Sequence, residues 1–155
     1  MLKDAKDKGA EIHTVPETST EGRRLYPHLV THVSEEMTIM QEEIFGPLMP
    51  IKPYRDIQDV ISYINQNQRP LALYIMSDDR RPVEHITRHT HSGGVGVNDT
   101  VLHVGAEDAP FGGIGESGIG HYHGEEGFRT FSHAKTILDT PTWLPRVGIL
   151  MERRS

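Results

Sequence analysis

The most regular pattern of apolar positions lies in the middle of the chain. Ile57, Val60, Ile61 and Ile64 recur at intervals of three and four residues, the spacing of one face of an α-helix. Asp56 precedes them, and its short carboxylate suits a helix N-cap. The pattern therefore predicts an amphipathic helix that begins after Asp56.

Shorter apolar runs and turn residues predict the elements that follow. The continuous apolar run 71–76 is typical of a strand buried on both faces. Pro82 suits the first turn of a second helix, which would reach about His91 and stop at the glycines that follow. Residues 95–98 predict another strand. Strands that alternate with helices predict an α/β fold, in which a mostly parallel sheet is connected by crossover helices.

The two ends of the chain predict shorter elements. Before Asp56 we expect a short helix closed by Gly9, strands at 10–14, 29–33 and 51–54, and a polar loop at 16–24. After residue 120 we expect a helix at 125–131 and a terminal strand at 134–138. No internal repeat is visible.

Composition limits the possible functions. The 155 residues suffice for one domain with a core, and the net charge of -6 argues against a nucleic-acid or acidic-membrane partner. No run of apolar residues is long enough to span a membrane, and the charged first residues predict no secretory signal, so the expected location is the cytoplasm. The sequence contains no cysteine, which excludes disulfides, thiolate metal sites and a cysteine nucleophile within this chain.

The segment 111–120 holds five glycines in ten residues. Residues 113–118 fit the spacing of a dinucleotide-binding loop, G-x-G-x-x-G, but such a loop acts between a strand and a helix N-terminus. The preceding residues 107–110 do not predict a strand. A glycine-rich surface loop with tight turns is the favoured interpretation, and a pyrophosphate cradle is the alternative.

Ten histidines raise the question of a metal site. His121 and His123 form one close pair, and His89 and His91 form another. A zinc site needs three or four converging ligands, and the spacing indicates no third one. Surface histidines are the favoured interpretation, and we predict no metal ligands.

Residues 42–47 combine two glutamates, an aromatic residue and a rigid Gly-Pro turn. A carboxylate such as Glu43 can accept two hydrogen bonds from a ribose diol, and Phe45 offers a flat apolar wall for a planar ring. From these residues alone, a loop with solvated glutamates and a core phenylalanine is the favoured interpretation, and a cofactor-binding loop is the alternative.

The same residues begin a resemblance to the aldehyde dehydrogenase family that covers nearly the whole chain. Gln41–Pro47 resembles the family's E-E-x-F-G-P signature, and further motifs follow in the family's order: 92–98, 110–113, Ser117-Gly118, Gly124 and 128–136. Asn98-Asp99, residues 121–124 and residues 131–133 resemble the branch that contains the class 3 and coniferyl aldehyde dehydrogenases.

The resemblance implies a fold and residue roles. Residues 1–132 would be the later part of the α/β catalytic domain, and residues 133–155 an oligomerisation strand and tail, through which a homodimer would form. Glu43 would bind the nicotinamide ribose of NAD or NADP, and Phe45 would pack beside the nicotinamide. Asn98, Val101 and His103 would lie on the loop near the aldehyde substrate.

The family's reaction also needs a cysteine nucleophile, a glutamate that activates water and an oxyanion-hole asparagine, and the resemblance places all three upstream of this region. We therefore predict no catalytic residue in this chain. We expect a C-terminal fragment of an NAD(P)-dependent dehydrogenase that oxidises an aldehyde, with coniferyl or another aromatic aldehyde as a candidate, and is inactive alone. A non-catalytic remnant that acts in assembly or binding is the alternative, and a histidine-based metal binder is a weaker one.

Overall fold

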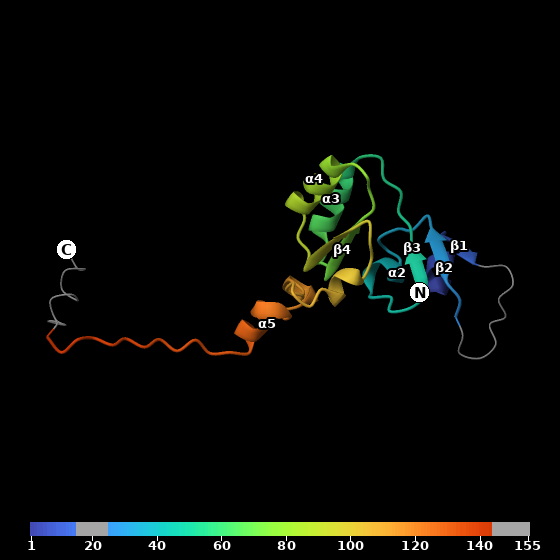
Figure 1. The fold of residues 1–155 in the computed structure, drawn as a ribbon. Coiled ribbons are helices and arrows are strands. Elements are labelled where there is room, and N and C mark those ends of the chain that lie inside the picture. The colour runs from blue at the N-terminus through green and yellow to red at the C-terminus, as the bar shows by residue number, and fades with distance from the viewer. Residues whose placement is uncertain (15–24, 144–155) are drawn as a thin grey trace, which may run out of the picture. The chain divides into compact units, whose positions relative to one another are not determined.

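The computed structural model describes residues 1–14 and 25–143, and the chain divides into two compact units, Met1–Tyr63 and Ile64–Ser155 (Figure 1). The first unit contains the loop with Glu43. The second contains the glycine-rich segment and the predicted substrate loop.

The first unit is built on a three-stranded sheet in the order β1-β2-β3. Strands β1 (Glu11–Thr14) and β2 (His28–Thr31) pair antiparallel, and β3 (Leu48–Pro50) pairs parallel with β2. The helices of this unit are α1 (Leu2–Asp7) and the four-residue α2 (Thr38–Gln41), and α3 (Ile57–Gln66) begins near its end. Gly9, at φ +95°, ends the turn after α1 as predicted.

A small core joins α1, β2 and α2. Its buried side chains are Ala5, Ala10, Val30, Met37 and Ile39, and partly buried apolar side chains that include Met40, Ile44 and Leu48 pack against it. Burial of this apolar surface is the main force that holds the short α2 in place, because four residues are too few for a helix to be stable alone.

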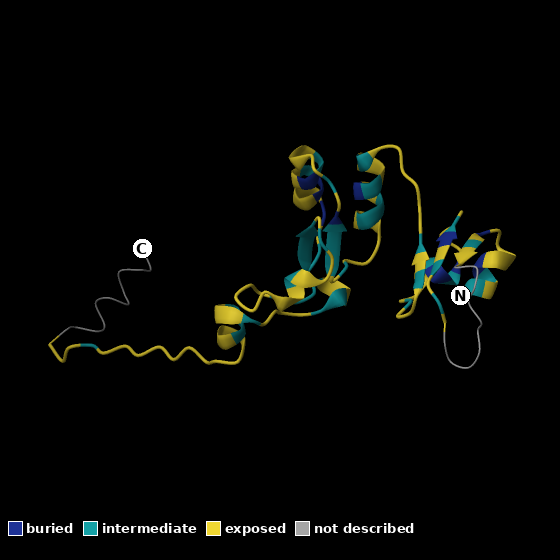
Figure 2. Ribbon diagram, turned by 45° about the vertical axis from the view of Figure 1, so that its right-hand side comes forward, coloured by how far each residue is buried: buried dark blue, intermediate teal, exposed yellow. Residues whose placement is uncertain are grey.

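The second unit contains one strand–helix–strand repeat. Strands β4 (Ala72–Ile75) and β5 (Gly94–Val97) pair in parallel, and α4 (Arg80–His89) connects them. Val83 and Ile86 are the buried residues of α4, and Ile75 is the buried residue of β4. Figure 2 shows buried positions, in dark blue, in the helix and the strand of this repeat. Asp79 caps α4, because its side chain accepts a hydrogen bond from the Arg81 N–H at 3.0 Å.

Beyond β5 the chain forms two 3₁₀ helices, Leu102–Gly105 and Gly115–Ser117, and then α5 (Gly124–Thr130). Residues 132–143 form no helix or strand within the described chain. The strand predicted at 134–138 is therefore not formed by this chain alone, and whether it forms with a partner stays a prediction.

The α/β class and the mostly parallel pairing are confirmed, but several details differ. The strand predicted at 51–54 was wrong: β3 ends at Pro50, and the following residues form no strand. Strand β3 pairs in parallel with β2. Strand β4 is only half-buried along most of its length, so the strand buried on both faces that the apolar run predicted is not found among the described residues.

Candidate functional site

Glu43 and Phe45 lie on the loop between α2 and β3. Phe45 is 94% exposed and adopts a positive φ of +41°, which is uncommon for a bulky residue. Glu43 is exposed, and among the described residues its carboxylate has no hydrogen bond or ion pair. The core-phenylalanine interpretation is therefore wrong for Phe45, since its ring projects from the surface of this unit.

The loop is fixed at both ends although its tip is exposed. Met40 and Ile44 pack against the core on either side of Glu43. After the tip, the Leu48 N–H donates to the Gly46 carbonyl at 2.9 Å, and the His28 N–H donates to the Pro47 carbonyl at 2.9 Å. The backbone around Glu43 is therefore held while its side chain stays available.

This arrangement can bind a nucleoside. A free carboxylate can accept hydrogen bonds from both hydroxyls of a ribose, and an exposed aromatic ring two residues away can cover a planar heterocycle. The residues present thus fit the nicotinamide end of NAD or NADP.

Asn98, in the second unit, has a structural role that the sequence did not indicate. It follows β5 at φ +55°, where asparagine is tolerated better than most residues. Its Oδ1 accepts from the Ser77 N–H at 2.8 Å, and its Nδ2 donates to the Ser77 carbonyl at 3.0 Å. The Asn98 side chain therefore joins the carboxyl ends of β4 and β5. It does not line the neighbouring cavity, which is formed by residues that include Val101 and His103.

Val101 and His103 line that cavity, which has a volume of about 330 Å³ and also contacts Tyr74. Val101 precedes the first 3₁₀ helix at φ +68° and is 63% exposed, an outlier for a β-branched residue. Such strain is often found in ligand-binding loops. The structure thus brings Val101 and His103 together and turns Asn98 away.

His103 belongs to a cluster of rings. Its ring lies 5.6 Å from that of Tyr74 and 5.7 Å from that of Phe111, and the Phe111 ring lies 5.7 Å from that of Tyr122 and 6.0 Å from that of His123. Both ring nitrogens of His103 are buried without a hydrogen-bond partner among the described residues. His103 therefore offers the cavity mainly ring surface. Tyr74 and Phe111 could not be predicted from the sequence, because no local spacing links them to residue 103.

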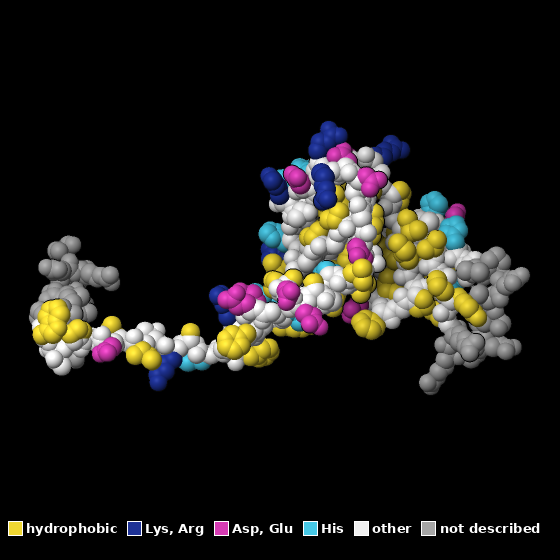
Figure 3. Space-filling model, viewed as in Figure 1, with side chains coloured by type: hydrophobic (Ala, Val, Ile, Leu, Met, Phe, Trp, Pro, Cys, Tyr) yellow, Lys and Arg dark blue, Asp and Glu magenta, His cyan; other side chains and the backbone are white. Residues whose placement is uncertain are grey.

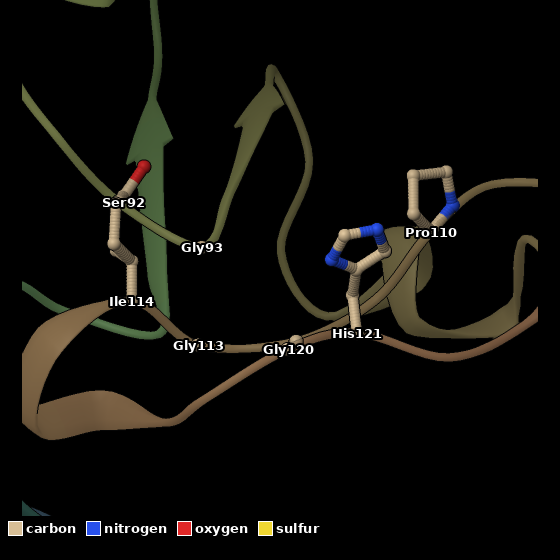
Figure 4. A pocket seen from close by; sticks show the side chains of 8 residues that line it. Ser92, Gly93, Pro110, Gly113, Ile114, Gly120 and His121 are labelled. Atoms are coloured by element: carbon tan, nitrogen blue, oxygen red, sulfur yellow. The ribbon is translucent and has the colours of Figure 1, made fainter. Parts of the chain in front are cut away.

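The glycine-rich segment packs backbone against backbone. A Cβ atom on Gly93 would lie 2.2 Å from the Gly112 carbonyl oxygen, and one on Gly112 would lie 2.2 Å from the Gly120 carbonyl oxygen. Figure 4 shows these chain segments passing close together beside a cavity of about 370 Å³, with His121 and Pro110 at one end. An isolated β-bridge joins Phe111 and Tyr122 at the ends of this segment. No strand of the described chain leads into the segment, and a pyrophosphate cradle needs one.

The shifted pKa values around α2 and β3 belong to structural ion pairs. The hydrogen bond from Lys52 lowers the pKa of the Glu35 carboxyl, and the same contact raises the pKa of Lys52. Burial raises the pKa of Tyr63, whose hydroxyl donates to Glu35 at 3.1 Å. These groups tie the segment before α2 to the residues that follow β3.

Two further observations concern the described residues only. No three histidine or carboxylate side chains in residues 1–14 and 25–143 are placed to hold a metal ion. None of the helices in these ranges is both long and apolar enough to cross a membrane.

Comparison with known proteins gives consistent matches. The sequence pattern of the aldehyde dehydrogenase family matches residues 1–137. A probable coniferyl aldehyde dehydrogenase of Pseudomonas aeruginosa is 52% identical over 142 residues, which are 90% of this chain and 29% of that protein. The coniferyl aldehyde dehydrogenase of a Pseudomonas species is 47% identical, over 88% of this chain and 30% of that protein. The chain thus spans less than a third of the length of these relatives.

Solved structures show the same relationship. The substrate-bound state of Staphylococcus aureus AldH superposes with a TM-score of 0.78 at 34% identity, covering 98% of this chain and 34% of that one. A Mycobacterium tuberculosis aldehyde dehydrogenase complexed with NAD⁺ also gives a TM-score of 0.78, at 30% identity, covering 92% of this chain and 30% of that one. The chain belongs to the aldehyde dehydrogenase family.

Proposed function

We propose that this chain forms part of an NAD(P)-dependent aldehyde dehydrogenase that oxidises an aldehyde to the carboxylic acid. It would supply the wall beside the nicotinamide and part of the aldehyde tunnel. The observation that carries the proposal is the loop of the first unit. Its backbone is anchored, the Glu43 carboxylate has no partner among the described residues, and the Phe45 ring is 94% exposed.

Glu43 and Phe45 would orient the cofactor. The Glu43 carboxylate would accept hydrogen bonds from the two ribose hydroxyls, and the Phe45 ring would pack against the nicotinamide. The bound cofactor supplies the hydride acceptor for the oxidation. Orientation matters because a small misplacement of the reacting atoms can slow such a transfer many-fold.

The nucleophile must come from elsewhere. The sequence contains no cysteine, so the thiolate that attacks the aldehyde in this family would lie outside the 155 residues, as would the glutamate that activates water. We therefore expect this chain alone not to reduce NAD⁺ or NADP⁺. Turnover of an aldehyde by the purified chain would contradict this expectation.

We propose an aromatic aldehyde, such as coniferyl aldehyde, as substrate. Relatives that are 52% and 47% identical carry that name. The cavity of about 330 Å³ is bounded by Tyr74, Val101 and His103, whose aromatic and aliphatic surfaces suit a planar ring.

Residues 133–155 would form the subunit contact, although residues 144–155 lie outside the part of the chain that the structure describes. Ile137 is 80% exposed, Leu138 86% and Trp143 79%, and Figure 3 shows hydrophobic side chains standing out along the segment that follows α5. An extended segment with exposed apolar side chains can add a strand to the sheet of another subunit. The same exposure favours the second candidate function, a non-catalytic assembly module.

The test is a chimera. This chain would replace the matching segment of the longer Pseudomonas aeruginosa relative, and coniferyl aldehyde oxidation would be measured with NAD⁺ and NADP⁺. Glu43→Gln should lower kcat/KM for the cofactor about tenfold or more, because a hydrogen bond to a charged group contributes about 1.5–3 kcal/mol. Glu42→Gln, a change of the neighbouring exposed glutamate, is the matched control. Unchanged kinetics in Glu43→Gln would remove that residue from the cofactor site.

A further inference from the structure

Helix α2 begins without a cap of its own. The residue at its N-cap position, Met37, makes no side-chain cap hydrogen bond. The first amide of α2 is satisfied instead from α1: the Asp4 Oδ2 accepts a hydrogen bond from the Thr38 N–H at 2.8 Å, across 34 residues of sequence. An unpaired helix amide is unfavourable, so this contact fixes where α2 begins.

Lys8 completes the connection. Its Nζ lies 2.7 Å from the Asp4 Oδ1 and donates to the Glu36 carbonyl at 2.6 Å. The Asp4 side chain is 30% exposed and the Lys8 side chain 40%, whereas the Lys3–Asp7 pair on the same helix is 89% and 59% exposed. The two side chains thus form hydrogen bonds with the backbone of Glu36, just before α2, and of Thr38, its first residue.

From Thr38 the connection continues to the loop. The Glu42 N–H donates to the Thr38 carbonyl at 3.1 Å, and Glu42 directly precedes Glu43. Both backbone groups of Thr38 are therefore hydrogen-bonded: its N–H donates to Asp4, and its carbonyl accepts from Glu42 at the start of the loop. A shift of Thr38 would move the backbone next to Glu43.

We propose that Asp4 is a positioning residue for the Glu43–Phe45 loop, acting through Thr38 with the help of Lys8. That this loop binds a nicotinamide cofactor rests on the proposed function, whereas the positioning itself does not. The hydrogen bonds from Lys8 and from the Thr38 backbone also lower the pKa of Asp4 to about 2, because both contacts favour the ionised carboxylate.

The experiment measures backbone amide exchange in the 155-residue chain and three variants at one pH. Asp4→Ala removes the acceptor and should speed exchange at Thr38 and Glu42 about five- to tenfold, the usual effect of losing a cap. Amides paired between β1 and β2 should keep their rates. Asp4→Asn retains an oxygen acceptor and should restore most of the protection. Asp7→Ala, which removes an exposed pair from the same helix, should change neither Thr38 nor Glu42.

Unchanged exchange at Thr38 and Glu42 in Asp4→Ala would overturn the proposal. So would an equal acceleration through β1 and β2 in both Asp4 variants, since that pattern means a general loss of stability. In the chimera, Asp4→Ala should raise the KM for the cofactor about fivefold and leave the KM for the aldehyde unchanged, because loss of the cap loosens the Glu43–Phe45 loop. An equal rise in both would also count against positioning. Failure of the cofactor assignment would show instead as unchanged kinetics in Glu43→Gln with the exchange pattern intact.

Discussion

At the residue scale, single side chains hold the ends of elements together. Asn98 connects the ends of β4 and β5 through both polar atoms of its amide, with hydrogen bonds of 2.8 and 3.0 Å to the Ser77 backbone. Asp4 does the same for α1 and α2. Both residues are polar and close to candidate loops, yet their hydrogen bonds go to the backbone of other segments.

Asn98→Ala should lower the free energy of unfolding by about 1–3 kcal/mol, because two hydrogen bonds are lost and alanine is strained at a positive φ. Asn98→Gly removes the same hydrogen bonds without that strain and should fall between the wild type and the alanine variant. Urea unfolding of the three proteins measures this order. Equal midpoints for the wild type and Asn98→Ala would contradict a structural role.

Asp4 should make stability depend on pH in the acid range. Its pKa is lowered from 3.8 to about 2 in the folded chain, so its contribution is present above pH 3.8 and is lost as the pH falls through about 2. The stability difference between wild type and Asp4→Asn should therefore be full at about pH 6 and shrink on acidification. Urea midpoints at about pH 6, 4 and 3 test this, with Asp7→Asn as control. A difference that does not change with pH would show that the Asp4 charge is not responsible.

At the scale of elements, the glycine-rich segment depends on close backbone contact. A Cβ atom on Gly93 would lie 2.2 Å from the carbonyl oxygen of Gly112 and 2.6 Å from that of Leu71. The segment after β5 therefore lies directly against the start of that strand. This contact, and not a phosphate-binding turn, explains why glycines are needed there.

Gly93→Ala should destabilise the second unit by about 3 kcal/mol, since neither carbonyl is on a flexible side chain that could move away. Gly105→Ala is the matched control, because nothing lies within 4 Å of its Cβ position. Hydrogen exchange in β4 and β5 would report the difference. Equal protection in the two variants would show that the backbone shifts easily at Gly93.

At the scale of the whole molecule, much apolar surface of the second unit is exposed. Ile119 is 101% exposed, Phe131 86% and Leu138 86%, and surfaces of this kind usually mark contacts with other protein segments. The cavities described above lie in this same unit. Both proposed functions, dehydrogenase part and assembly module, require that these side chains become covered.

If residues 133–155 form the proposed homodimer contact, changing Ile137 and Leu138 together to aspartate should shift that dimer to monomer, because two charges would have to be buried in the contact. Light scattering after size-exclusion chromatography measures the mass. Lys135→Glu, on the same exposed segment, should leave the dimer intact. An unchanged mass in the double variant would place the subunit contact elsewhere.

The sequence by itself determined the local features. The apolar spacing predicted α3, and Asp56 does cap it: its Oδ1 accepts from the Gln58 N–H at 2.9 Å. The sequence also predicted the end of the first helix at Gly9 and the family motif around Glu43. Turn chemistry, capping and helical periodicity act over only a few residues. The family assignment followed from motifs in order and is confirmed over residues 1–137.

Only the tertiary structure decided the rest. The place of β3, its pairing with β2, the exposure of Phe45 and the contact of Asp4 with Thr38 depend on segments far apart in sequence. Asp4 and Thr38 lie 34 positions apart in the sequence, and no repeating pattern between them predicts the contact. Packing of α1, β2 and α2 around a shared core selects it, because apolar burial is non-directional and only the folded chain shows which polar groups it brings together.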